Sequence, residues 1–296
     1  MGQFVPHIAS GFVFTLLGLW HTLNTIKAYN LGCGSNFKVR FWYPLDRPHS
    51  NLKYLELILV FSFSVIGIFG QFWDYPFIHL SFNVINLEHA TMFLHLAVFS
   101  GFALYNELNH SSNLLSGVEG VFAACVFSQE LFLSGVEGVF AACVFSQELF
   151  LLHFHSADHN GIEGHYHWLL QLIVFASLVS VIVAACCPTC FPAAIVLSLL
   201  VVLQGCWFMN MGFMLWVPNL VPKGCSMRIV ENGKDEMLGA VICASKEADM
   251  RARALANLQF SWILAGILIF TGFISLKCTK SDTCTPKIQL SDYEQL

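Results

Sequence analysis

Histidines gather in one short stretch of this 296-residue chain. Five of them fall within residues 153–167, together with Asp158 and Glu163. Histidine is the commonest metal ligand and the side chain whose charge changes most readily near neutral pH. The stretch separates two long apolar segments. It therefore predicts a metal-binding or proton-handling site where a lipid-embedded helix bundle meets water.

A second group of candidate ligands lies within the apolar segment 85–108. Glu88 and His95 are seven residues apart there and would share one helix face. Ionisable residues inside a membrane are costly, so they are functional candidates by default. The two groups together form the predicted metal site, which consists of Glu88, His89, His95, His153, His155, Asp158, His159, Glu163, His165 and His167.

Imidazole and carboxylate ligands suit zinc or another divalent transition metal, with haem as a less favoured cofactor. Asp158 and Glu163 could instead fix the orientation of ligating histidines. Two other interpretations stay open. The histidines could sense or transfer protons, or they could simply bond loop carbonyls and lipid headgroups.

The composition places the chain in a membrane. Hydrophobic residues make up 56% of it and charged residues only 11%, with a mean hydropathy of +0.65. Soluble domains are about 25% charged. Runs of about 20 apolar residues recur, and each is long enough to cross roughly 30 Å of hydrocarbon as a helix. No basic patch with interleaved aromatic residues occurs, so nucleic acid is excluded as a partner and the lipid bilayer is expected.

These runs predict an all-α, multi-pass transmembrane bundle with about seven spans. One transmembrane domain would cover residues 1–276, and a short polar cytosolic tail would cover 277–296. The predicted helices are 8–28, 54–73, 85–108, one within 114–154, 166–186, 191–216 and 255–276.

The fourth region contains a tandem duplication. Residues 116–133, SGVEGVFAACVFSQELFL, recur unchanged as residues 134–151. Eighteen residues are five helical turns, so the copy preserves helical phase and adds about 27 Å. The first copy could extend the fourth helix, fold back, or cross separately and give eight spans. We expect the second copy, beside the histidines, to be the fourth span.

Basic residues and cysteines predict the orientation. Lysines and arginines after the first span and in the tail mark those segments as cytosolic, although the loop 217–254 carries six of its own. Cys225 and Cys243 are the two cysteines of that loop. They can pair if it is lumenal. Cys186, Cys187 and Cys190 would then be cytosolic, as would Cys278 and Cys284 of the tail. These juxtamembrane cysteines are candidates for palmitoylation, with unmodified thiols as the alternative. The Cys187–Cys190 spacing could also suit redox or zinc chemistry.

No nucleotide-binding or hydrolase motif appears, so the sequence assigns no enzymatic reaction. The C-terminal Tyr293–Leu296 has the Tyr-x-x-bulky pattern of a sorting signal. It predicts adaptor binding and a non-catalytic scaffold or trafficking role as the alternative function.

Several strings resemble one family, the transmembrane protein 45 family, also described as domain of unknown function 716. They are residues 145–171, Leu87-Glu88-His89 with Thr91-Met92, residues 203–207 and 212–216, and residues 11–21. Residues 218–225 and 259–262 resemble its plant branch. The resemblance covers about residues 1–276 and departs from the family only in the second copy of the 18-residue repeat.

The resemblance implies a multi-pass protein of endomembranes or the plasma membrane. It also implies a link to stress, since plant relatives are described as responsive to viral infection. No enzymatic activity is established for the family, and the resemblance identifies no metal ligands. The predicted metal site therefore rests on this chain's own residues.

Overall fold

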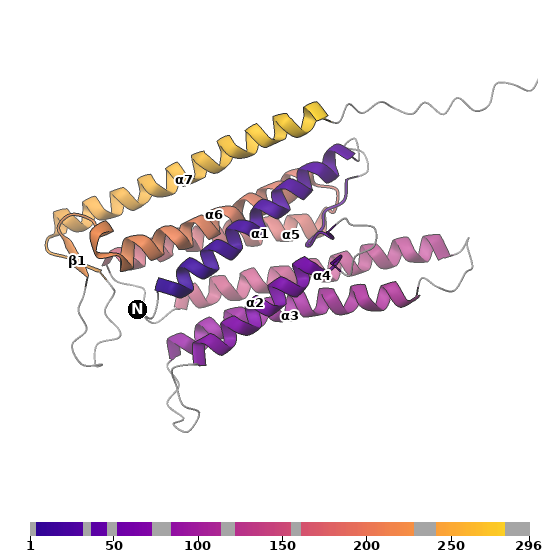
Figure 1. Ribbon diagram of the computed structural model, residues 1–296, viewed down its shortest axis with the longest axis horizontal. Helices are drawn as coiled ribbons and strands as arrows, with labels where there is room; N and C mark the ends of the chain where they lie inside the picture. Colours follow the sequence, from indigo (N-terminus) through magenta and orange to yellow (C-terminus); the bar gives the residue numbers. More distant parts are fainter. Residues whose placement is uncertain are drawn as a thin grey trace, which may run out of the picture.

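The computed structural model is a bundle of long α-helices, and it describes residues 4–31, 37–45, 52–72, 84–113, 122–154, 161–227 and 241–281 (Figure 1). The helices are α1 (Phe4–Leu31), α2 (Leu55–Phe72), α3 (Val84–Asn113), α4 (Phe122–Phe154), α5 (Gly161–Cys186), α6 (Phe191–Trp216) and α7 (Lys246–Ser281). A single 3-10 turn, η1 (Pro218–Leu220), and two short strands, β1 (Cys225–Met227) and β2 (Val241–Cys243), lie between α6 and α7.

Within the described residues, seven helices are long and apolar enough to cross a membrane. The predicted all-α, seven-span fold class is therefore confirmed. The ends of α7 differ most from the prediction, because α7 begins at Lys246 and not at residue 255. Its first turns are polar. The Ala248 amide donates to the Ser245 hydroxyl, and Glu247 and Asp249 favour a helix N-terminus, which a hydropathy pattern does not detect.

The duplicated segment extends α4. Helix α4 runs without a break from Phe122 to Phe154, so the described part of the first copy continues the helix and does not cross separately. Within α4, the residues Gly135–Phe154, most of them from the second copy, are long and apolar enough to cross the membrane. With 33 residues, α4 is about 50 Å long and exceeds the roughly 30 Å hydrocarbon core.

Helices α1 and α6 pack closely because glycines line their contact. A Cβ added to Gly205 would overlap the backbone of Thr15, and one added to Gly18 would overlap the backbone of Val202. Helix association in lipid depends on such close backbone approach, since no hydrophobic driving force acts between helices there. This contact aligns α1 beside α6 along the bundle (Figure 1).

The two ends of the bundle differ in chemistry. At the hairpin end, β1 and β2 pair antiparallel and a disulfide joins Cys225 to Cys243, as the sequence predicted. At the opposite, or turn, end, residues 187–190 connect α5 to α6. Helix α7 lies along the outside of the bundle and is little buried over its span (Figure 1).

Candidate functional site

A carboxyl group and an amide meet in the middle of the bundle. Glu148 of α4 accepts a hydrogen bond from Nε2 of Gln204 in α6, and Gln204 is fully buried. Among the described residues, the Gln204 Oε1 atom is buried without a hydrogen-bond partner. Intramembrane ionisable residues are expensive to bury and mark pathways for ions, protons or substrates. This pair is therefore the centre of the candidate site.

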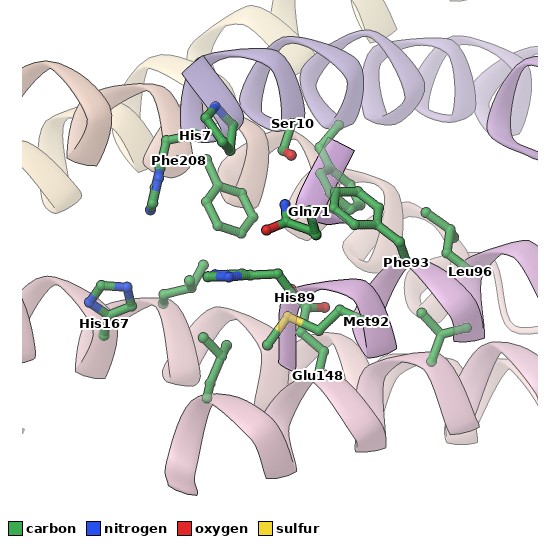
Figure 2. Close-up of a pocket in the computed structure, with 15 residues that line it drawn as sticks. His7, Ser10, Gln71, His89, Met92, Phe93, Leu96, Glu148, His167 and Phe208 are labelled. Atoms are coloured by element: carbon green, nitrogen blue, oxygen red, sulfur yellow. The ribbon is translucent and has the colours of Figure 1, made fainter. Parts of the chain in front are cut away.

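The first cavity opens from Glu148 toward the hairpin end, and we call it the hairpin-end cavity. Its volume is about 90 Å³, room for several water molecules, since one water needs roughly 10–15 Å³. Figure 2 shows His89, Met92 and Glu148 on one side of it and His7 and Phe208 across from them. The remaining residues that line it are Pro6, Ser10, Phe14, Gln71, Phe93, Leu96, Val144, Leu152, His167 and Leu170.

Three histidines from three helices line this cavity: His7, His89 and His167. His7 is buried, with its ring 4.8 Å from that of Trp216 and 6.4 Å from that of His167. His167 is also buried, and its Nδ1 donates to the carbonyl of Glu163 at 3.0 Å. The lining thus provides three imidazoles, the side chain that serves most often in proton transfer.

The second cavity lies toward the turn end, and we call it the turn-end cavity. It has a volume of about 100 Å³, and its polar lining includes His21, Arg40 and Glu56. Four residues line both cavities: Phe14, Leu96, Val144 and Glu148. Of these four, Glu148 alone can carry a charge or a proton, so the two cavities meet at one titratable side chain.

Glu56 anchors a polar network beside the turn-end cavity. Its carboxylate accepts hydrogen bonds from Trp20 Nε1 at 2.8 Å, from His21 Nε2 at 2.7 Å and from the Tyr43 amide at 2.8 Å. The Tyr43 hydroxyl forms a hydrogen bond with the Thr25 hydroxyl at 2.9 Å. Burial raises the pKa of Tyr43. The network joins α1, α2 and the segment 37–45.

One sequence expectation at this end is wrong. The proximity of Lys53 and Glu56 in the sequence suggests that they pair, but the Lys53 ammonium lies 3.6 Å from the carboxylate of Glu107 in α3. Lys53 is half exposed at the surface, whereas Glu56 faces inward, so the two side chains point to different neighbours.

The predicted metal site is not supported. Among the described residues, no group of three or more His, Cys, Asp or Glu side chains is arranged to hold a metal ion. Of the ten predicted ligands, His89 and His167 line the hairpin-end cavity, and Glu163 is buried one helical turn before His167. His155, Asp158 and His159 lie outside the described residues.

The other predicted ligands have different surroundings. His165 donates from Nε2 to Asn257 Oδ1 of α7 at 2.9 Å, and the ring of the exposed His153 contacts Phe154. His95 donates from Nδ1 to the Thr91 carbonyl at 2.9 Å. Each of these three histidines thus contacts a different protein neighbour.

The three predicted ligands on α3 differ in their relation to the cavity. His89 lines it with Met92, Phe93 and Leu96, whereas Glu88 and His95, which share a face, do not. Both faces carry ionisable residues, so the sequence cannot fix the rotation of the helix. The packing of α3 against α2 and α4 decides it.

Three residues of the site were not singled out. His7 stands apart from the other histidines in the sequence, Glu148 belongs to a duplicated segment, and Gln204 carries no charge. The available signal was the position of Glu148 and Gln204 deep inside apolar runs, where polar side chains are rare.

Over the part of the chain that the structure describes, the fold and the site define a class of protein: an integral membrane bundle of seven helices with an internal polar centre. Residues 134–276 match a family of unknown function (DUF716). The match begins at the first residue of the second repeat copy and contains both Glu148 and Gln204. It supports the resemblance over that part of the chain.

Proposed function

We propose that this chain is a membrane protein of the DUF716 family that passes protons between the two sides of the bilayer through Glu148. One observation carries the proposal: Glu148 lines both cavities, so a proton that it accepts from one cavity can leave to the other. We further propose that the chain is a member of the plant-like branch of the transmembrane protein 45 family and that it resides in endomembranes or the plasma membrane. These two assignments rest on sequence motifs.

The surroundings of Glu148 suit this role. A carboxyl group in an apolar interior is stable as the neutral acid, and ionisation needs polar contacts. The Gln204 amide donates a hydrogen bond to one carboxyl oxygen of Glu148. Glu148 retains part of its accessible surface, so cavity water can reach its side chain. Glu148 can therefore exist in both protonation states at a single position.

Each cavity places further titratable groups beyond Glu148. His7, His89 and His167 lie on the hairpin-end side. His21 and Glu56 lie on the turn-end side. Histidine exchanges protons with water near neutral pH, so such groups can supply protons to the centre and remove them. The histidines thus act here by proton exchange, one of the alternatives that the sequence left open.

Proton flux into vesicles tests the proposal. The purified protein would be reconstituted into vesicles loaded with a pH-sensitive dye, with the potential clamped by potassium and valinomycin. An imposed pH gradient should collapse faster than in protein-free vesicles. Glu148→Gln keeps the shape and an amide oxygen for Gln204 but cannot take up a proton, so its flux should fall to the protein-free level.

Glu137→Gln is the matched control. Glu137 is a buried carboxyl of the same helix, but it lines neither cavity. Its flux should equal that of the unchanged protein. Equal flux for Glu148→Gln and the unchanged protein would sink the proposal. Protein-free rates for the folded, unchanged protein would favour the non-catalytic scaffold instead.

A further inference from the structure

Two neighbouring thiols are exposed where α5 ends. Cys186 is the last residue of α5, and Cys187 begins the turn into α6. Both are exposed free thiols, whereas Cys190, three residues on, is partly buried. Backbone hydrogen bonds fix the turn, with the Cys187 amide donating to Val183 at 2.8 Å and the Cys190 amide to Cys187 at 2.9 Å. The pair is therefore held at the boundary between the apolar span and water.

The position of the disulfide indicates which compartment these thiols face. Disulfides form and persist in oxidising compartments such as the endoplasmic reticulum lumen and the cell exterior. The Cys225–Cys243 disulfide lies at the hairpin end, just beyond the end of α6. Helix α6 crosses the membrane between this hairpin and the 187–190 turn. The turn end, with Cys186 and Cys187, therefore faces the reducing cytosol.

Basic side chains beside the turn agree with this orientation. The Val39 amide donates to the Pro188 carbonyl at 2.6 Å, which fixes the segment 37–45 against the turn. Along this segment Phe37 and Val39 are buried, whereas Lys38 and Arg40 are exposed. Exposed Lys and Arg next to a membrane span are typical of the cytosolic side and attract anionic lipid headgroups.

We propose that Cys186 and Cys187 are sites of reversible S-acylation by long-chain fatty acids. The acyl donor is a long-chain acyl thioester such as acyl-coenzyme A, and a membrane acyltransferase catalyses the transfer. The cysteine sulfur forms a new thioester bond with the acyl carbonyl carbon, and the donor's carbon–sulfur bond breaks. The donor leaves as a thiol with the proton that the cysteine loses, so no oxidant or reductant is needed.

The adjoining surface of α5 suits the attached chains. Val179, Ile182 and Val183 are exposed on the last two turns before the cysteines. An acyl chain on either sulfur can turn back into the bilayer beside these side chains. Juxtamembrane cysteines next to basic residues are the usual setting of this modification.

Acyl exchange on the full-length protein expressed in eukaryotic cells tests the proposal. Free thiols are blocked, thioesters are cleaved with hydroxylamine, and the released thiols are labelled with a polyethylene-glycol maleimide that adds a visible mass. The unchanged protein should shift by one or two labels only after hydroxylamine. Cys186→Ser/Cys187→Ser should lose that shift, while its melting temperature stays the same because both side chains are exposed.

Cys143→Ser is the matched control, because Cys143 is also an exposed free thiol but lies near the middle of the α4 span. It should keep the full shift. The proposal is overturned if the unchanged protein shows no hydroxylamine-dependent label. It is also overturned if the double variant keeps the label and Cys278→Ser, at the turn end of α7, removes it.

Discussion

At the scale of single residues, the Glu56 carboxylate holds the turn end together. It accepts three hydrogen bonds, from Trp20, His21 and the Tyr43 amide, and it is mostly buried. Hydrogen bonds to a charged group contribute about 1.5–3 kcal/mol each, and a buried donor left without an acceptor adds a desolvation cost. The network is thus a concentrated source of stability between α1 and α2.

Removing this carboxylate should destabilise the protein. Glu56→Ala should lower the free energy of unfolding by about 2–4 kcal/mol, because at least one buried donor loses its acceptor. The measurement is a thermal unfolding curve in detergent, followed by tryptophan fluorescence. Glu107→Ala removes only the partly exposed pair with Lys53 and should cost at most about 1 kcal/mol. Equal losses in the two variants would contradict this account of the network.

At the scale of elements, the α1–α6 contact depends on residues without side chains. Gly11 and Gly18 of α1 face Met209 and Val202 of α6, and Gly205 of α6 faces Thr15. Each contact is backbone against backbone or nearly so. Phe14 of α1 lines both cavities, so a movement of α1 away from α6 would open them.

A methyl group at Gly205 should therefore force the two helices apart. Gly205→Ala should destabilise the protein by about 1–3 kcal/mol, the usual cost of overpacking. A lower melting temperature in the same detergent would show it. Gly266→Ala is the control, because a Cβ there meets no atom within 4 Å among the described residues of the chain. An unchanged melting temperature for Gly205→Ala would mean that the contact is looser than described.

At the scale of the whole molecule, the duplication lengthens α4. The contacts of α4 that matter to the site come from the second copy, through Glu148 and Val144. Helices α3 and α4 pack directly against each other. Without residues 116–133, residues 108–115 and 134–136 would still connect α3 to α4.

Deleting residues 116–133 should therefore leave the fold and the site intact. Because the copies are identical, deleting 134–151 gives the same sequence, and the one remaining copy can occupy the positions of the second. The melting temperature should change by less than the effect of Gly205→Ala, and proton flux should persist. Loss of folding in the single-copy protein would show that the extension of α4 is itself structural.

The sequence by itself determined the class of the protein and much of its topology. Apolar runs of about 20 residues must become membrane-spanning helices, since the backbone has no water to bond in lipid. The cysteine pair of one loop likewise predicted the Cys225–Cys243 disulfide, which the structure contains. Both follow from local composition and spacing.

The tertiary structure alone decided which polar residues meet. Histidine density along the chain predicted a metal site, yet among the predicted ligands that the structure describes, His89 and His167 line a cavity and the other histidines contact separate neighbours. The rotation of each helix about its axis decides which side chains face inward, and that rotation depends on packing between helices. The pairing of Glu148 with Gln204 joins residues 56 positions apart in the chain. No local pattern encodes that contact, and only the packing of α4 against its neighbours produces it.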